Sequence, residues 1–296
     1  MDHVLTLIAP TGSSALTKDM AAAAGAALID AGAQPGPTDW LDPGIACDIP
    51  FAGAENTEAA VRARLADAPL DIAIQAVADR RRMLLIADME STIIGQELID
   101  ELAEIADVGS RIADITARSM AGELDFAAAL HERVALLAGQ PEAILDQAAQ
   151  RISLNPGARE LVQTMRAHGA YTALVSGGFT RFTEPVRETC GFDEARGNKL
   201  IITAGRIAGT VGEPILGREA KATALAELAA QRGLTAEQTC AVGDGANDMA
   251  MLQAAGLGVA YHAKPIIRTA ARVRIEHGDL TALLFLQGYR RREFSG

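Results

Sequence analysis

One stretch decides the fold: Met83-Leu84-Leu85-Ile86-Ala87-Asp88-Met89-Glu90-Ser91-Thr92. Five apolar residues precede an acid, a spacer, a second acid and two hydroxyls. An apolar run of this length is typical of a fully buried strand in a parallel sheet. In open α/β sheets, ligands bind at the carboxyl ends of the strands. We therefore expect Asp88 and Glu90 to lie in a functional site, as a nucleophile and a general acid.

Three further apolar runs also end in polar residues. They are Tyr171 to Val175 before Ser176-Gly177-Gly178, Thr239 to Val242 before Gly243-Asp244-Gly245-Ala246-Asn247-Asp248, and Leu257 to Tyr261 before His262. Helical patterns separate these runs, such as Pro156 to His168 and Arg218 to Gln231. This alternation predicts an α/β fold with a doubly wound parallel sheet. The polar clusters would then meet at one edge of that sheet.

The segment from about 96 to 155 is almost wholly helical in pattern. Phe126, Leu130, Arg133 and Leu137 share one helix face at spacings of i, i+4, i+7 and i+11. Because the segment is too long for a simple crossover, we expect a helical cap above the sheet edge. Residues 199–207 predict a smaller insertion, a β-hairpin around Ala204-Gly205.

Residues 1–80 predict a separate, small α+β domain that precedes a second domain at 81–296. Its expected elements are a strand at 4–8, a helix capped by Thr11-Gly12-Ser13-Ser14 and stopped by Gly32, strands near 39–41 and 45–51, a helix capped at Asn56-Thr57, and a strand at 72–76. The order strand, helix, strand, strand, helix, strand is that of a ferredoxin-like module.

Composition narrows the class of protein. The chain has 296 residues, 49% of them apolar, and a net charge of −11 without a basic stripe. This argues against nucleic acid or an anionic membrane as the main partner. The short clusters Arg80-Arg81-Arg82 and Arg290-Arg291-Arg292 are expected to be a solvated linker and tail.

Cysteine usage and hydropathy predict a cytoplasmic protein. The three cysteines, Cys47, Cys190 and Cys240, are widely spaced without a CxxC motif, which is typical of reduced thiols. Cys47 and Cys240 lie in apolar runs and are expected in the core. We expect neither a signal peptide nor a membrane span, since no basic start precedes an apolar block and no run of about 18 apolar residues occurs.

The polar clusters together favour phosphoryl transfer. Carboxylates such as Asp244 and Asp248 are ligands that Mg²⁺ prefers. Backbone N–H groups of a Gly-rich turn suit a phosphate, and the ammonium group of Lys221 would neutralise a transferring phosphoryl group. The residues therefore predict metal-assisted phosphoryl transfer through an aspartyl-phosphate.

Four motifs in order resemble those of the haloacid dehalogenase superfamily. They are Asp88-Met89-Glu90-Ser91-Thr92, Ser176-Gly177-Gly178-Phe179, Lys221 and Gly243-Asp244-Gly245-Ala246-Asn247-Asp248. The resemblance covers roughly residues 83 to 290. Two further stretches resemble the phosphoserine phosphatase family in particular. They are Ile94-Gly95-Gln96-Glu97-Leu98-Ile99-Asp100-Glu101-Leu102, and Met120-Ala121-Gly122-Glu123-Leu124-Asp125-Phe126 followed by Arg133-Val134. By element order alone, residues 1–80 resemble ACT-like domains. This resemblance implies one of three roles: a ligand sensor, a dimerisation module or a structural appendage.

The resemblance implies a role for each site residue. Asp88 is the nucleophile, and Mg²⁺ is bound by Asp88, Asp244 and the main-chain carbonyl of Glu90. Asp248 supports the metal shell through water or orients Lys221. The phosphoryl oxygens are held by Ser176, Gly177, Gly178 and Lys221, while Asn247 binds the phosphate or shapes its loop.

Cap residues would recognise the rest of the substrate. The resemblance implies that Glu97 holds its amino group, Arg133 holds its carboxylate and Phe126 closes the pocket. An acid and an arginine with a bidentate grip complement the ammonium and carboxylate of an amino acid.

Glu90 departs from the family, which has aspartate at that position and uses it as general acid and base. Its extra methylene moves the carboxyl by up to ~1.5 Å, and a displacement near 1 Å can cost on the order of 10²-fold in rate. Three interpretations stay open: the local structure compensates, the enzyme is slow, or the position is altered so that an intermediate is stabilised.

The resemblance implies an Mg²⁺-dependent hydrolase that releases L-serine and phosphate from L-phosphoserine, the last step of serine biosynthesis. One alternative is a phosphatase of phosphothreonine or phosphohomoserine. Another is a catalytically weakened, regulatory member. The expected partners are the small substrate and, as a candidate, a second copy of the chain in a homodimer.

Overall fold

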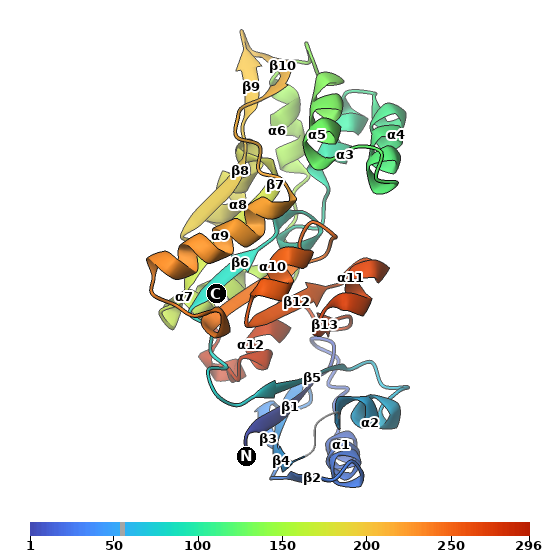
Figure 1. Cartoon of the computed structure of the whole chain (residues 1–296), viewed down its shortest axis with the longest axis vertical. Helices are drawn as coiled ribbons and strands as arrows, with labels where there is room; N and C mark the ends of the chain where they lie inside the picture. The colour runs from blue at the N-terminus through green and yellow to red at the C-terminus, as the bar shows by residue number, and fades with distance from the viewer. Residues whose placement is uncertain (54–56) are drawn as a thin grey trace.

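The computed structural model of the chain describes residues 1–53 and 57–296. Its strands form two large sheets and one small hairpin, which follow each other along the long axis of the molecule (Figure 1). We call the part around the first sheet the first module and the remainder the second module. The domain boundary near residue 80 stays a prediction, and the predicted cap residue Asn56 lies outside the described residues.

The first module is a five-stranded antiparallel sheet with the order β2-β4-β1-β5, in which β3 also pairs with β4. The strands are β1 (His3–Ile8), β2 (Ala33–Pro35), β3 (Asp39–Asp42), β4 (Ala46–Gly53) and β5 (Asp71–Ala76). Leu5, Leu7 and Ile49 pack against α1 (Lys18–Asp30) and α2 (Thr57–Arg64). This is the predicted ferredoxin-like order with one addition, the short strand β2.

The start of α1 differs from the prediction. Thr17 is the N-cap, and its hydroxyl accepts a hydrogen bond from the Met20 N–H at 3.2 Å. The predicted cap residues at 11–14 form a turn instead, in which the Ser13 hydroxyl donates to the Pro10 carbonyl at 2.6 Å. The stop is as expected, because Gly32 follows the helix in the left-handed region with φ of 86°.

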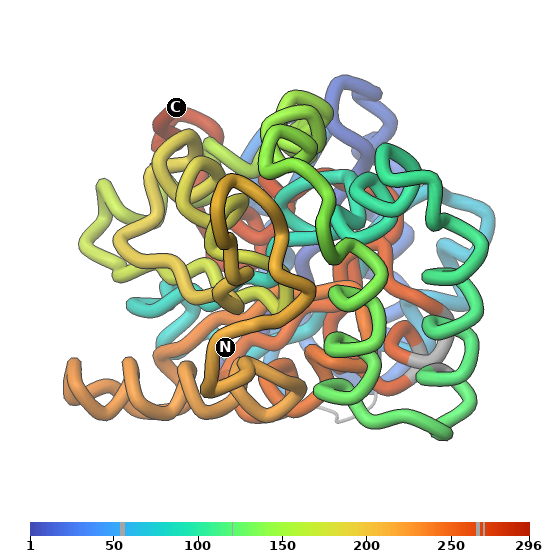
Figure 2. The backbone as a smooth tube through the Cα atoms, turned by 90° about the horizontal axis from the view of Figure 1, so that it is seen from above, coloured from blue at the N-terminus to red at the C-terminus, as the bar shows by residue number. Residues whose placement is uncertain are grey.

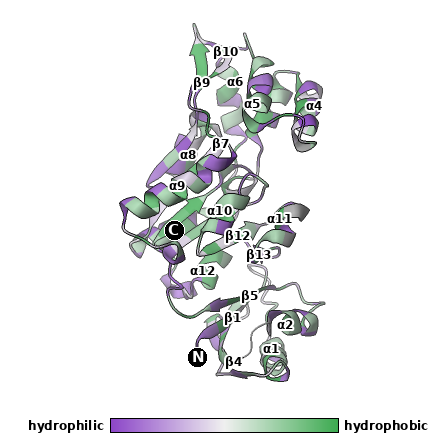
Figure 3. Cartoon of the chain, in the orientation of Figure 1, coloured by the Kyte–Doolittle hydropathy of each residue, from purple (hydrophilic) through white to green (hydrophobic). Residues whose placement is uncertain are grey.

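Six parallel strands form the sheet of the second module, in the order β13-β12-β11-β6-β7-β8. They are β6 (Leu84–Ala87), β7 (Tyr171–Phe179), β8 (Glu194–Asn198), β11 (Thr239–Gly243), β12 (Leu257–Tyr261) and β13 (Val273–Ile275). The central strands are hydrophobic, as Figure 3 shows. The predicted strand at 171–175 was too short, since β7 continues through the Ser-Gly-Gly segment.

Helices cover both faces of this sheet. Leu85 and Ala87 of β6 pack on one side against α7 (Ala158–Ala167), α8 (Thr180–Cys190) and α12 (Ala282–Leu286). Leu84 and Ile86 pack on the other side against α9 (Arg218–Gln231), α10 (Met249–Ala254) and α11 (Pro265–Ala270). The prediction of a doubly wound α/β fold is confirmed, and Cys47 and Cys240 are buried as expected.

The predicted helical segment contains α3 (Leu98–Ile105), α4 (Gly109–Met120), α5 (Phe126–Ala135) and α6 (Ala143–Gln150). It stands beyond the carboxyl end of the sheet together with the predicted hairpin, β9 (Leu200–Thr203) and β10 (Arg206–Val211) (Figure 1). Seen from above in Figure 2, the green cap segment lies nearest the viewer and the blue first module lies behind the sheet. A Cβ at Gly209 would lie 2.7 Å from the Ala138 Cβ, so glycine lets the hairpin approach the cap.

The arginine clusters correct a prediction, because three of their members bind other parts of the protein instead of only solvent: Arg82 is buried, and Arg80 and Arg290 are half-buried. Arg80 donates to Asp48 at 2.7 Å and to the Leu286 carbonyl at the end of α12 at 3.0 Å. Arg82 is buried and donates to the Glu237 carbonyl, and Arg290 pairs with Asp39 at 2.6 Å. Arg81, Arg291 and Arg292 are exposed as predicted. Arg80 and Arg290 therefore join the two modules.

Asp71 of β5 makes another contact between the modules. Its carboxylate is buried and accepts hydrogen bonds from three consecutive N–H groups, those of Glu276, His277 and Gly278, the shortest at 2.7 Å. Burial raises the pKa of Asp71, although the three N–H donors oppose the rise. This carboxylate fixes the loop that follows β13 to the first module.

No helix in the described ranges, 1–53 and 57–296, is both long enough and apolar enough to cross a membrane.

Replacing Asp71 by alanine should destabilise the protein. The change leaves three backbone N–H groups without their acceptor, and an unsatisfied group that is buried, as that of Gly278 is, costs about 1–3 kcal/mol. We expect the free energy of unfolding in urea to fall by on the order of 3 kcal/mol. Asp67→Ala is the matched control, because Asp67 is exposed on the same module. Equal unfolding curves for the two variants would contradict the role of Asp71.

Candidate active site

Asp88 stands at the end of the central strand β6. Its N–H donates to the Val242 carbonyl of β11 at 3.0 Å, so the strand pairing still holds the backbone there. The chain then makes one irregular turn over residues 89–93, in which Ser91 takes the left-handed region with φ of 54°. This turn places the Asp88 side chain at the sheet edge, where the Met89 N–H donates to its Oδ1 at 2.7 Å.

Lys221 of α9 joins two carboxylates of this edge. Its Nζ lies 2.7 Å from Asp88 Oδ1 and 2.6 Å from Asp248 Oδ1, and all three side chains are buried. Burial alone would lower the pKa of Lys221, but the two carboxylates outweigh it and raise that pKa. Burial and then Asp248 raise the pKa of Asp88 well above its usual range, against the opposing effect of Lys221. Two buried carboxylates thus share one ammonium group.

Asp244 completes an acidic cluster with Asp88 and Asp248. One carboxylate oxygen of each lies within 4.8 Å of the others, and all three are buried. Burial raises the pKa of Asp244, and Asp248 raises it further. Three buried carboxylates with one shared ammonium fit a divalent cation, which prefers oxygen ligands and would offset their repulsion. The residues therefore offer a metal site.

Glycines permit the close packing of the loop after β11. A Cβ at Gly243 would lie 2.3 Å from the Asp248 Cγ, and one at Gly245 would lie 2.5 Å from Asn247 Oδ1. The Gly245 N–H donates to Asp248 Oδ2 at 3.0 Å. Asn247 is half-buried in this loop and lines a groove of about 730 Å³ together with Phe126. Its contact with a phosphate stays a prediction.

The second motif faces the first across the sheet edge. The Ser176 hydroxyl is buried, accepts from the Gly178 N–H at 2.8 Å, and lies 3.4 Å from Glu90 Oε2. A Cβ at Gly178 would lie 2.8 Å from Glu90 Oε2, and one at Gly177 would lie 2.8 Å from Phe126 Cζ. Both glycines are therefore required for the approach of Glu90 and of the cap residue Phe126.

The Glu90 carboxyl reaches from the core to the cap. Its Oε1 accepts the N–H of Leu98, the first residue of α3, at 2.9 Å. Burial, then the neighbouring charge of Glu97, raises the pKa of Glu90 to about 7. Such a carboxyl exchanges a proton readily near neutral pH, which suits a general acid and base. Its side chain lies outside the acidic cluster, and metal binding through its main-chain carbonyl stays a prediction.

Two cap-side charges complete the site. Glu97 Oε1 accepts the Ser91 hydroxyl at 2.8 Å, so the turn after β6 orients it. The Arg133 guanidinium is half-buried, and its Nε donates to the Ala129 carbonyl at 3.1 Å. Burial lowers the pKa of Arg133, while the charges of Glu90, Asp100 and Glu97 raise it. Arg133 forms no ion pair within 1–53 and 57–296, which leaves its charge available to a ligand.

Sequence reasoning missed Lys264. Its Nζ lies 3.5 Å from Asp244 Oδ2 and 3.9 Å from Glu97 Oε1. Burial would lower the pKa of Lys264, but the two acids outweigh it and raise that pKa. Its position alone gave a signal, because Lys264 follows β12, the strand beside β11, by only three residues.

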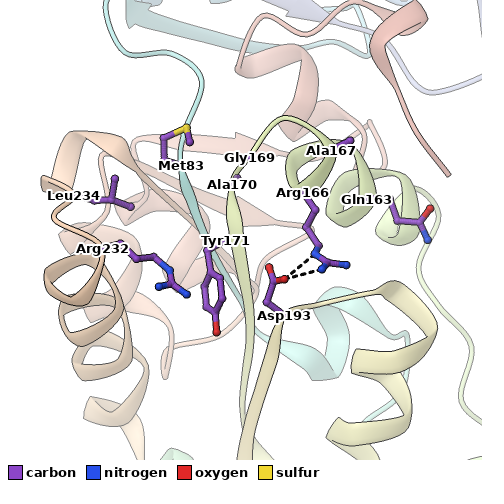
Figure 4. A pocket seen from close by; sticks show the side chains of 10 residues that line it. All are labelled: Met83, Gln163, Arg166, Ala167, Gly169, Ala170, Tyr171, Asp193, Arg232 and Leu234. Carbon is purple, nitrogen blue, oxygen red and sulfur yellow. Dashed lines mark hydrogen bonds and ion pairs between the residues drawn. The ribbon is translucent and has the colours of Figure 1, made fainter.

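A second cavity, shown in Figure 4, lies at the opposite edge of the sheet, where β7 begins at Tyr171. Its charged groups contact each other: Arg166 pairs with Asp193 at 2.8 Å, and the Arg232 guanidinium lies 3.3 Å from the centre of the Tyr171 ring. This cavity is distant from Asp88 along the strands and contributes nothing to the site.

Known proteins resemble the chain in both sequence and structure. The model of the haloacid dehalogenase-like hydrolase family matches residues 85–253. The phosphoserine phosphatase of Streptomyces coelicolor is 41% identical over 85% of this chain and 62% of its own length. That of Streptococcus thermophilus is 43% identical over 67% of this chain and 92% of its own. The chain spans about three-fifths of the length of the first curated relatives it matches.

A solved structure resembles nearly the whole chain. It is a probable phosphoserine phosphatase from Vibrio cholerae in unliganded form, with a TM-score of 0.81 and 32% identity. The alignment covers 99% of this chain and 88% of that one. Together with the family match, this structural similarity assigns the fold and the family of the chain. The chain belongs to the haloacid dehalogenase-like hydrolases and, among them, to the phosphoserine phosphatase family.

Proposed function

We propose that the protein is a metal-dependent phosphatase that hydrolyses L-phosphoserine to L-serine and phosphate. The observation that carries the proposal is that Asp88, at the end of β6, contacts Lys221 at 2.7 Å and forms a buried acidic cluster with Asp244 and Asp248. Relatives named phosphoserine phosphatase at about 40% identity support the substrate.

The first step transfers the phosphoryl group to Asp88. An Asp88 carboxylate oxygen attacks phosphorus, the bond from phosphorus to the serine oxygen breaks, and Glu90 donates its proton to that oxygen. Lys221, the Ser176 hydroxyl and the Gly177 N–H would balance the charge on the phosphoryl oxygens. A Glu90 carboxyl with a pKa of about 7 is partly protonated at neutral pH, as this step requires.

The second step hydrolyses the aspartyl-phosphate. Glu90, now a carboxylate, removes a proton from water, and the water oxygen attacks phosphorus. The bond from phosphorus to the Asp88 oxygen breaks, which releases inorganic phosphate and restores both carboxyl groups to their starting forms. Ser176 lies 3.4 Å from Glu90 Oε2 and helps to orient it.

We assign Mg²⁺ to the acidic cluster. Asp88, Asp244 and the main-chain carbonyl of Glu90 would hold it, with Asp248 supporting it or orienting Lys221. When bound, the cation neutralises charge on the phosphate.

Recognition of the amino acid falls to the cap. Glu97 would bind the ammonium, Arg133 would bind the carboxylate by a bidentate contact, and Phe126 would close the pocket over Gly177. Asn247 would donate to the phosphate from the loop after β11.

The remaining assignments follow from the same family. We divide the chain into an ACT-like domain at 1–80 and a phosphatase domain at 81–296, with its cap at about 96–155. The ACT-like domain would serve as a ligand sensor or a dimerisation module in a homodimer. The reaction would be the last step of serine biosynthesis, carried out in the cytoplasm.

Phosphate release is the direct test of this proposal. We expect release from L-phosphoserine with Mg²⁺, and little with EDTA or after Asp88→Asn, because the amide cannot form the aspartyl-phosphate. A malachite green assay on matched concentrations measures the rates, and thermal melting checks that Asp88→Asn is folded. Release from phosphothreonine or phosphohomoserine but not from phosphoserine would refute the substrate, and equal rates for Asp88→Asn would refute the nucleophile.

Glu90 can be tested with two substitutions. Glu90→Gln keeps the shape and the Leu98 hydrogen bond but cannot transfer a proton, so kcat should fall by about 10²–10⁴-fold. Glu90→Asp keeps the proton donor and should remain active. If Glu90→Gln retained the full kcat, Glu90 would not be the acid. An Asp variant faster than the natural chain would mean that the added methylene misplaces the carboxyl.

A further inference from the structure

Lys264 lies inside the site but takes part in none of the steps above. It stands on the short loop between β12 and α11, where its N–H donates to the Asp244 carbonyl at 3.1 Å. Its ammonium points back to the same residue, 3.5 Å from Asp244 Oδ2, and to Glu97 Oε1 at 3.9 Å. One side chain thus contacts both a proposed metal ligand and the proposed ligand of the substrate ammonium.

Lys264 and Lys221 form ion pairs with different carboxylates of the site. Lys221 is shared by Asp88 and Asp248, and both of its contacts are buried. Within 1–53 and 57–296, Asp244 and Glu97 form ion pairs with Lys264 and with no other side chain. Removing this ammonium would therefore leave two carboxylates uncompensated at the mouth of the site.

The positive charge of Lys264 has opposite effects on the binding of a metal ion and of a phosphate. A cation at this position repels a divalent metal ion approaching Asp244 and attracts the phosphate of the substrate. We propose that Lys264 is a charge-balancing residue that weakens metal binding and strengthens phosphate binding in this site. The claim about phosphate binding, the phosphate half of the proposal, rests on the proposed function. The claim about metal binding, the metal half, concerns only the acidic cluster.

The loop around Lys264 is held from the side opposite to the site. The His262 N–H donates to the Ile275 carbonyl at 2.9 Å, and its Nε2 lies 2.9 Å from the Gly278 carbonyl. Gly278 is one of the residues whose N–H is bound by Asp71. Lys264 is therefore positioned by a fixed loop, although 59% of its side chain is exposed. This exposure means that its substitution leaves the core intact.

The test compares metal and phosphate binding by the full-length chain. Isothermal titration of the EDTA-stripped protein with MgCl₂ gives the metal Kd, and titration with inorganic phosphate at saturating Mg²⁺ gives the phosphate Kd. The variants are Lys264→Met, Lys264→Arg and Lys199→Met. The last is the matched control, because it removes the same charge from an exposed residue beside the hairpin.

For Lys264→Met we expect the Mg²⁺ Kd to fall and the phosphate Kd to rise, each by about two- to five-fold, the range of a partly exposed ion pair. Lys264→Arg and Lys199→Met should stay close to the natural chain. Shifts of the same sign for both ligands, no shift, or equal shifts in Lys199→Met would overturn the proposal. Failure of phosphoserine turnover with a shifted Mg²⁺ Kd would refute the proposed function but support the metal half.

Discussion

The active-site edge depends on one buried ammonium, that of Lys221. Without it, Asp88 and Asp248 would place two carboxylates in a dry volume at the ends of adjacent strands, which is far more costly than a paired arrangement. Lys221 reaches them from α9, so the helix must pack in one register against Leu84 and Ile86 of the sheet. Catalytic geometry and core packing are thus set by the same contacts.

Close backbone approaches complete this edge. Gly243, Gly177 and Gly178 each stand where a Cβ would meet a site side chain at less than 3 Å. These glycines let carboxylates and an aromatic ring from different segments share a small volume. Glu90 therefore packs directly against the Ser-Gly-Gly segment, and the cap residue Phe126 packs directly against Gly177.

The sequence predicted which residues gather at this sheet edge, because their positions along the chain are encoded locally. Asp88, Ser176 and Asp244 each follow an apolar run, and parallel strands bring such positions together in any doubly wound sheet. Contacts that depend on tertiary partners were not predictable. In the sequence, Arg80 and Arg82 are typical of solvated charges. In the structure they donate to carbonyl groups at the end of α12 and just before β11, which lie far away along the chain. Lys264 belongs to no motif and to no apolar helical pattern in the sequence, so nothing in the pattern singled it out. The start of α1 was ambiguous because several residues with hydroxyl groups precede it.

The hydrogen bond from the Leu98 N–H to Glu90 has a consequence for the alignment of the proposed acid. Leu98 begins the cap, whereas Glu90 belongs to the turn that carries the nucleophile. Any displacement of α3 relative to this turn would separate the Leu98 N–H from the Glu90 carboxyl. If Glu90 serves as the proposed acid, the position of the cap and the alignment of that acid are coupled through this one hydrogen bond.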